Sequence, residues 1–253
     1  MPYASNHGTK IYYEVEGQGI PLIIHHGLSA DLESWRENGY VDALKDDCQV
    51  ILMDARGHGK SDKPHDPALY GGEMYAGDVS AMMDDIGLAA ANFFGYSFGG
   101  GVAFELAKRI PERLISIICG GCGARLPGKE MLEGQIAFYR AGPEAMLKIY
   151  EHGGALTLRI KEHILANDSQ ALVAICRAMM AEKSLLEDVP RMEMPFLIFA
   201  GDKDFTFAGA KETYEMLPNA SFIALPGLDH GLAGGSPELI VPQIKEFLKR
   251  VNS

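Results

Sequence analysis

The sequence predicts an α/β protein with a doubly wound, mostly parallel sheet, and a repeated alternation of patterns carries this prediction. Short runs rich in β-branched and aromatic residues recur along the chain, and each ends in glycine, aspartate or a loop signal. Helical patterns lie between these runs. Because right-handed crossovers pack each helix back onto the sheet, the alternation predicts helices on both faces. At 253 residues the chain can form one large α/β domain with an insertion.

The N-terminal residues predict an antiparallel hairpin. Residues 3–8 and 9–19 look like two strands joined at Asn6 to Gly8, where asparagine and glycine tolerate positive φ. Six further runs predict buried, mostly parallel strands: PLIIHHG (21–27), CQVILMDARG (48–57), ANFFGYS (91–97), LISIICGG (114–121), PFLIFAGDKD (195–204) and SFIALPG (221–227). The helices predicted between them are 33–44, 75–86, 98–109, 208–217 and 237–251, the last with Ser236 as its cap.

The alternation stops after Gly123. No convincing strand follows until about Pro190, and residues 136–139, 145–150 and 172–180 have helical apolar spacing. We therefore expect a core made of residues 1–122 and 191–253, and a helical cap insertion over 123–190. With no flexible linker in sight, the cap should pack on the core and enclose a pocket with it.

Composition excludes several classes of partner. The net charge is −11 and the lysines and arginines are dispersed, so we expect no nucleic acid to bind. No apolar stretch approaches the length of a membrane span and the N-terminus lacks a signal-peptide pattern, which predicts a soluble cytoplasmic protein with reduced thiols. Cys119 and Cys122 have CxxC spacing, but no second ligand pair accompanies them, so small residues at a strand end are the favoured interpretation.

The segment FFGYSFGGGVAFELA (93–107) places Ser97 between glycines, where a predicted strand changes into a predicted helix. Its GYSFG pentapeptide fits GxSxG, in the strand-turn-helix setting that a nucleophile elbow requires. Gly95 and Gly99 let strand and helix approach while the hydroxyl stays exposed. Helix capping by Ser97 is the alternative. At the start of the helix, the Phe98 amide is a candidate oxyanion donor.

These motifs, in this order, resemble the α/β-hydrolase superfamily, from the N-terminal hairpin to the last helix. The resemblance implies the α/β-hydrolase fold, with a small helical cap. In that family a histidine-glycine pair after an early strand precedes the second oxyanion donor, and HHGL here implies the Leu28 amide. The loop after the next strand, DARGHGKSD (54–62), is similar to one that supports the site. We expect no catalytic role for His58, in an exposed loop, and a structural role for His25, with either His25 or His26 able to reach the pocket.

The resemblance also implies a catalytic acid and base. In the family, a glycine, two residues and an aspartate commonly follow the penultimate strand, which favours Asp204 over Asp202, although Phe205 stands where the family often has proline. The base follows the last strand, and this implies His230. His230 would take the Ser97 proton and Asp204 would orient the imidazole, giving an acyl-enzyme that water hydrolyses. No metal or redox cofactor is needed: the triple glycine after Ser97 lacks the GxGxxG spacing of a dinucleotide loop.

The substrate is less readable from the sequence. The candidates to line an apolar pocket, of which we expect fewer than half to touch ligand, are Trp35, Phe98, Tyr139, Met179, Met180, Phe207 and Leu228. The favoured substrate-binding residues among them are Trp35, Tyr139, Met179 and Phe207. The resemblance favours a carboxylesterase or lactonase acting on a small-molecule ester or lactone. Two alternatives remain open: a carbon–carbon bond hydrolase of aromatic ring-fission products, with Arg125, Arg140 or Arg177 as polar cap groups, and a ligand receptor with slow hydrolysis.

Overall fold

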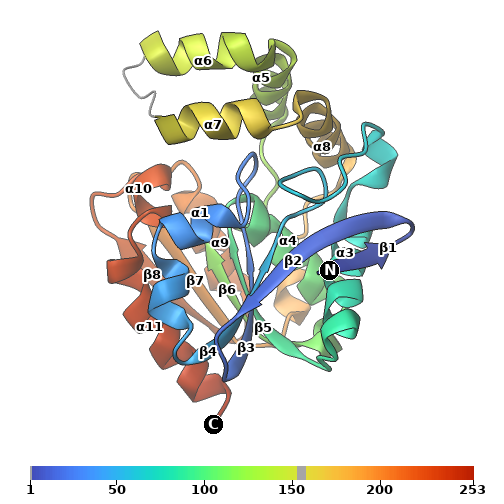
Figure 1. The fold of residues 1–253 in the computed structure, drawn as a ribbon. Coiled ribbons are helices and arrows are strands. Elements are labelled where there is room, and N and C mark those ends of the chain that lie inside the picture. The colour runs from blue at the N-terminus through green and yellow to red at the C-terminus, as the bar shows by residue number, and fades with distance from the viewer. Residues whose placement is uncertain (1, 153–157) are drawn as a thin grey trace.

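The computed structural model describes residues 2–152 and 158–253. In these residues an eight-stranded sheet forms the centre of the molecule, in the order β1-β2-β4-β3-β5-β6-β7-β8 (Figure 1). Strands β3 to β8 are parallel, whereas β2 is antiparallel to both β1 and β4. This confirms the predicted fold class. The strands are β1 (Tyr3–Asn6), β2 (Thr9–Glu16), β3 (Ile20–His25), β4 (Cys48–Met53), β5 (Ala91–Tyr96), β6 (Leu114–Gly120), β7 (Phe196–Gly201) and β8 (Ala220–Leu225).

Helices cover both faces of the sheet because successive strand residues point to opposite sides. On β3, Ile23 packs in one core with α3 and α4, while Leu22 and Ile24 pack in the other with α1, α2 and α11. The described helices are α1 (Glu33–Glu37), α2 (Tyr40–Leu44), α3 (Gly72–Ile86), α4 (Phe98–Arg109), α5 (Lys129–Arg140), α6 (Gly142–His152), α7 (Leu158–Ala166), α8 (Ser169–Ala181), α9 (Phe207–Met216), α10 (His230–Gly234) and α11 (Pro237–Val251), with 3₁₀ turns at Pro67–Leu69, Pro111–Arg113 and Val189–Arg191.

Helices α5 to α8 lie together across one end of the sheet, apart from the helices that flank its faces (Figure 1). Among the described residues of 123–190 no strand occurs, and α5 packs against α8. The cap boundaries at 123 and 190 stay a prediction, and residues 153–157 within them lie outside the described residues. No helix in the described part of the chain combines the length and apolarity needed to cross a membrane.

Several local predictions needed correction. The helix expected over 33–44 is two helices, because Gly39 adopts φ 82° between them. The N-terminal turn has its positive φ angles at His7 and Gly8, not at an asparagine. Ser236 precedes α11 without capping it, since its hydroxyl donates to the Leu232 carbonyl instead. The short helix α10 was not predicted.

Candidate active site

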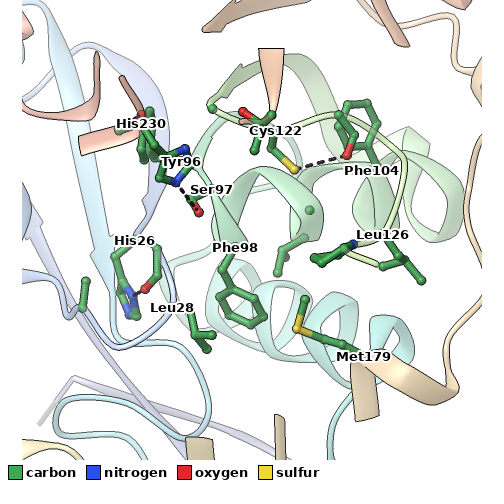
Figure 2. Close-up of a pocket in the computed structure, with 18 of the residues that line it drawn as sticks. His26, Leu28, Tyr96, Ser97, Phe98, Phe104, Cys122, Leu126, Met179 and His230 are labelled. Atoms are coloured by element: carbon green, nitrogen blue, oxygen red, sulfur yellow. Dashed lines mark hydrogen bonds between the residues drawn. The ribbon is translucent and has the colours of Figure 1, made fainter. Parts of the chain in front are cut away.

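Ser97 occupies the turn between β5 and α4. Its backbone adopts φ 55° and ψ −112°, a strained conformation for a residue with a side chain, and its amide donates to the Gly120 carbonyl at 2.8 Å. A Cβ on Gly95 would lie 2.1 Å from the Gly99 carbonyl oxygen, so the turn closes this tightly only with glycine there. The Ser97 side chain makes no capping hydrogen bond to α4. Its hydroxyl points toward His230 (Figure 2).

Two hydrogen bonds connect Ser97, His230 and Asp204, which are far apart in the sequence. The Ser97 hydroxyl lies 2.9 Å from His230 Nε2, and His230 Nδ1 lies 2.8 Å from Asp204 Oδ2. A carboxylate only accepts hydrogen bonds, so Nδ1 carries the proton and Nε2 is free to accept from the hydroxyl. The three groups thus have the geometry in which an imidazole can remove a serine proton.

Asp204 is held in place and in its ionised form. Its side chain is fully buried, and its second oxygen accepts from the Thr206 amide at 2.8 Å. Burial alone would raise the pKa of this carboxyl, but the hydrogen bonds from His230 and from Thr206 outweigh burial and lower it. Asp202, the other candidate acid, is exposed and accepts from the Gly227 amide instead.

The Leu28 and Phe98 amides flank Ser97 as the predicted oxyanion donors. Phe98 is the first residue of α4, where an amide has no partner within the helix. Within the described residues, neither amide has a recorded protein acceptor. Both residues line the same cavity as Ser97 and His230. Gly27 also brings the Leu28 loop against the nucleophile, because a Cβ on Gly27 would lie 3.6 Å from Ser97 Cβ.

Two buried histidines fix the loop that carries Leu28. His26 Nε2 accepts from the Ala55 amide at 3.0 Å, and His58 Nε2 accepts from the Ser29 amide at 3.1 Å. The expectation of an exposed His58 was wrong: its side chain is fully buried, because the loop after β4 folds under the Leu28 loop. In the sequence, only the resemblance of DARGHGKSD (54–62) to a site-supporting loop indicated that this segment holds the Leu28 loop in place. Of the His25–His26 pair, His26 lines the cavity, whereas His25 is buried and does not belong to the described lining.

We expect the histidine cluster to make the protein sensitive to acid. Burial, and then repulsion from His26, lowers the pKa of His25 to about 3. The unfolded chain binds this proton below pH ~6.5 while the folded protein does not, so stability present above pH ~6.5 is lost as the pH falls. Between pH 7 and pH 5, His25 alone should cost ~2 kcal/mol of the free energy of unfolding, measured by urea denaturation.

His25→Gln is the control variant for this effect, because glutamine cannot take up the proton. The loss between pH 7 and pH 5 should be smaller by ~2 kcal/mol in His25→Gln than in the parent protein. An equal loss in the two proteins would show that His25 does not hold a depressed pKa.

A cavity of about 760 Å³ opens beside Ser97, between the sheet end and helices α5 and α8. Trp35, Tyr139 and Met179 line it, although Trp35 is mostly core, packed on Tyr40, and their contact with a substrate stays a prediction. Phe207 is not part of the described lining: its ring packs on Phe222 of β8, with ring centroids 5.7 Å apart, which does not fit the expected ligand contact. Met180 and Leu228 are likewise absent from the described lining, whereas Phe98 belongs to it.

The cysteines beside the cavity are free thiols. Cys119 is buried at the end of β6, and Cys122 lines the cavity. Hydrogen bonding with Cys122, and then burial, raises the pKa of Cys119 well above its usual value, which keeps this thiol protonated. In the described part of the chain, no group of three or more histidine, cysteine or acidic side chains could hold a metal ion.

Comparison with known proteins agrees with this architecture. The α/β-hydrolase fold family matches residues 20–122. The enol-lactonase from Burkholderia xenovorans LB400 superposes with a TM-score of 0.80 and 26% identity, over 99% of this chain and 98% of the other. The chain therefore has the α/β-hydrolase fold.

Two curated relatives match along nearly their whole length. A non-heme chloroperoxidase from Streptomyces lividans is 27% identical, over 96% of this chain and 97% of its own. The bifunctional esterase/perhydrolase DCH from Acinetobacter calcoaceticus is 25% identical over the same shares. The α/β-hydrolase core of this chain therefore has counterparts with different named activities.

Proposed function

We propose that the protein is a serine hydrolase that cleaves small to medium carboxylic esters or lactones through an acyl-enzyme. The observation that carries the proposal is the pair of hydrogen bonds that runs from the Ser97 hydroxyl through His230 to Asp204. A strained serine turn lies at the same point, beside two amides that have no protein acceptor among the described residues. The enol-lactonase and the esterase named among its relatives support the choice of ester and lactone substrates.

In the proposed mechanism, Ser97 Oγ attacks the acyl carbon as its proton moves to His230 Nε2. The Leu28 and Phe98 amides bind the negative oxygen of the tetrahedral intermediate, and one such donor typically contributes ~3 to 4 kcal/mol. His230 then gives the proton to the leaving oxygen. Water, deprotonated by His230, attacks the acyl-enzyme and releases the acid, while ionised Asp204 stabilises the imidazolium at both stages.

An activity-based label tests this proposal. Treatment with a fluorophosphonate should add one adduct to the intact mass, because an activated serine displaces the fluoride. Ser97→Ala should show no adduct, and His230→Ala should form it far more slowly. An adduct that persists in Ser97→Ala would place the nucleophile elsewhere, and the absence of any adduct on the parent protein would contradict the proposal.

The arginines named for the carbon–carbon hydrolase alternative do not converge on Ser97. Arg140 and Arg177 are exposed and absent from the described cavity lining. Arg125 lines the cavity, but its guanidinium donates three hydrogen bonds to Glu212: Nη2 to Oε1 at 2.8 Å and to Oε2 at 3.0 Å, and Nε to Oε2 at 3.1 Å. An ester or lactone needs no such cation, which favours the proposed substrates.

A further inference from the structure

The cavity runs as a slot along helix α4. Phe98, Gly101, Val102 and Glu105 all line it, and their spacing places them on one face of the helix. Ser97 stands at the N-terminal end of this face. Glu105 is eight residues further along, which is ~12 Å at 1.5 Å per residue. A substrate bound at Ser97 can therefore extend along α4 toward a buried carboxylate.

A second carboxylate lines the same far end of the slot. Glu182 Oε1 accepts from the Gly72 amide at 3.1 Å, and Glu105 Oε2 accepts from Arg109 Nε at 3.0 Å. Glu105 is only 8% exposed. Burial raises its pKa, Arg109 opposes this, and the charge on Glu182 raises it further. Among the described residues, Glu105 forms an ion pair with Arg109, whereas Glu182 forms none.

Tyr75 adds a third polar group to the slot. Its side chain is 6% exposed and lines the cavity, with its ring packed edge-to-face on Phe98 at 5.4 Å. Its hydroxyl has no hydrogen-bond partner among the described residues. A buried hydroxyl left in this way costs free energy until a ligand group bonds to it. Tyr75 thus points independently to a polar group on the bound molecule.

The slot offers no free cation to an anionic substrate. Among the described lining residues Arg125 is the only lysine or arginine, and Glu212 occupies it in a forked ion pair. A carboxylate placed beside Glu105 and Glu182 would meet two like charges, whereas an ammonium would meet two opposite ones.

The position of His230 decides which part of the substrate enters the slot. His230 must give its proton to the leaving oxygen, so the alcohol lies on the His230 side of Ser97. There the Phe205 ring lies 4.7 Å from the imidazole and lines the cavity mouth. Met179 and Leu126 lie on the opposite side of Ser97 (Figure 2). The acyl chain is therefore the part that follows α4.

We propose that the slot binds acyl chains whose far end carries an ammonium or another hydrogen-bond donor, with Glu105 and Glu182 as its partners, and excludes acyl chains that end in a carboxylate. This inference rests on the proposed hydrolase function and names the substrate class. It sets the protein apart from a hydrolase for carboxylated lactones or ring-fission acids.

A matched series of ethyl esters tests the inference. At each of several chain lengths, three acyl chains are compared that end in ammonium, methyl or carboxylate. Ethanol release at pH 7 gives kcat/KM for each ester. At the best length, we expect kcat/KM for the ester with the ammonium-ended acyl chain to exceed that for the carboxylate-ended chain by at least tenfold. The value for the methyl-ended chain should lie between them. Turnover without this ranking overturns the inference and leaves the hydrolase proposal intact, whereas no turnover of any ester contradicts the hydrolase proposal itself.

Glu182→Gln tests the origin of the discrimination. Glutamine keeps an oxygen for the Gly72 amide but removes the charge, so the ammonium-to-carboxylate ratio of kcat/KM should fall at least fivefold. Glu187→Gln is the matched control, because Glu187 is exposed, lies outside the described lining and changes the net charge equally. An equal fall in both variants would assign the effect to net charge and overturn the role of Glu182.

Discussion

Replacing Ser97 with alanine should lower kcat for ester hydrolysis by at least ~10⁴-fold, with only residual catalysis from binding and the oxyanion donors. The reason is that the proposed acyl-enzyme cannot form without Oγ, while the amides of Leu28 and Phe98 stay in place. The measurement is steady-state hydrolysis of a neutral ester, with the free energy of unfolding of the variant determined alongside. The Ser97 hydroxyl makes no capping hydrogen bond to α4, so its removal should leave the fold intact.

The His230→Ala and Ser97→Ala/His230→Ala variants complete this experiment. Residues that act as one unit are grossly non-additive, so the double variant should be scarcely slower than Ser97→Ala alone. If the two losses multiply, His230 does not act through Ser97. A Ser97→Ala protein with substantial ester turnover would place the chemistry at another residue.

Replacing Asp78 with alanine should lower the free energy of unfolding by ~3 to 5 kcal/mol. Asp78 and Arg56 form an ion pair with side chains 1% and 0% exposed, with Nη2 to Oδ1 at 2.6 Å. Asn6 Nδ2 donates to Asp78 at 2.8 Å and to the Met74 carbonyl at 3.1 Å, so the variant leaves a buried cation without its counter-ion and removes one acceptor of Asn6. Burial raises the pKa of Asp78 despite Arg56, which shows that desolvation opposes the pair. Urea unfolding at pH 7 measures the loss.

Two further variants define the cause. Asp84 pairs with Arg113 at 2.8 Å but is 68% exposed, so Asp84→Ala should cost less than ~1 kcal/mol. The double variant Arg56→Leu/Asp78→Leu removes both charges and should be more stable than Asp78→Ala, because no unpaired charge remains buried. If Asp78→Ala and Asp84→Ala lower the free energy of unfolding equally, burial does not explain the contribution of the Arg56–Asp78 pair to stability.

Local signals allowed most of the fold to be predicted. An apolar run predicted each parallel strand. Helix α4 was predicted from Phe98 to Arg109 because Ser97 and Pro111 mark its two ends. Short elements escaped: α10 has five residues, too few for a periodic pattern, and the break between α1 and α2 depends on Gly39 adopting positive φ. Sequence periodicity and turn residues predict elements and their ends, but they do not predict a backbone conformation that the surrounding packing selects.

By itself, the sequence determined the α/β fold class and the turn at Ser97, because both depend on local motifs and on element order. Its resemblance to the α/β-hydrolase superfamily implied the place of Asp204 and His230 after the last two strands. Only the tertiary structure decided that His58 is buried beneath the Leu28 loop, that Phe207 turns away from the cavity, and that Glu105 meets Glu182 at its far end. The physical reason is distance along the chain. Contacts between α4 and α8, or between loops 27–30 and 54–58, arise when the sheet brings remote segments together. The spacing of residues within one segment does not predict such contacts.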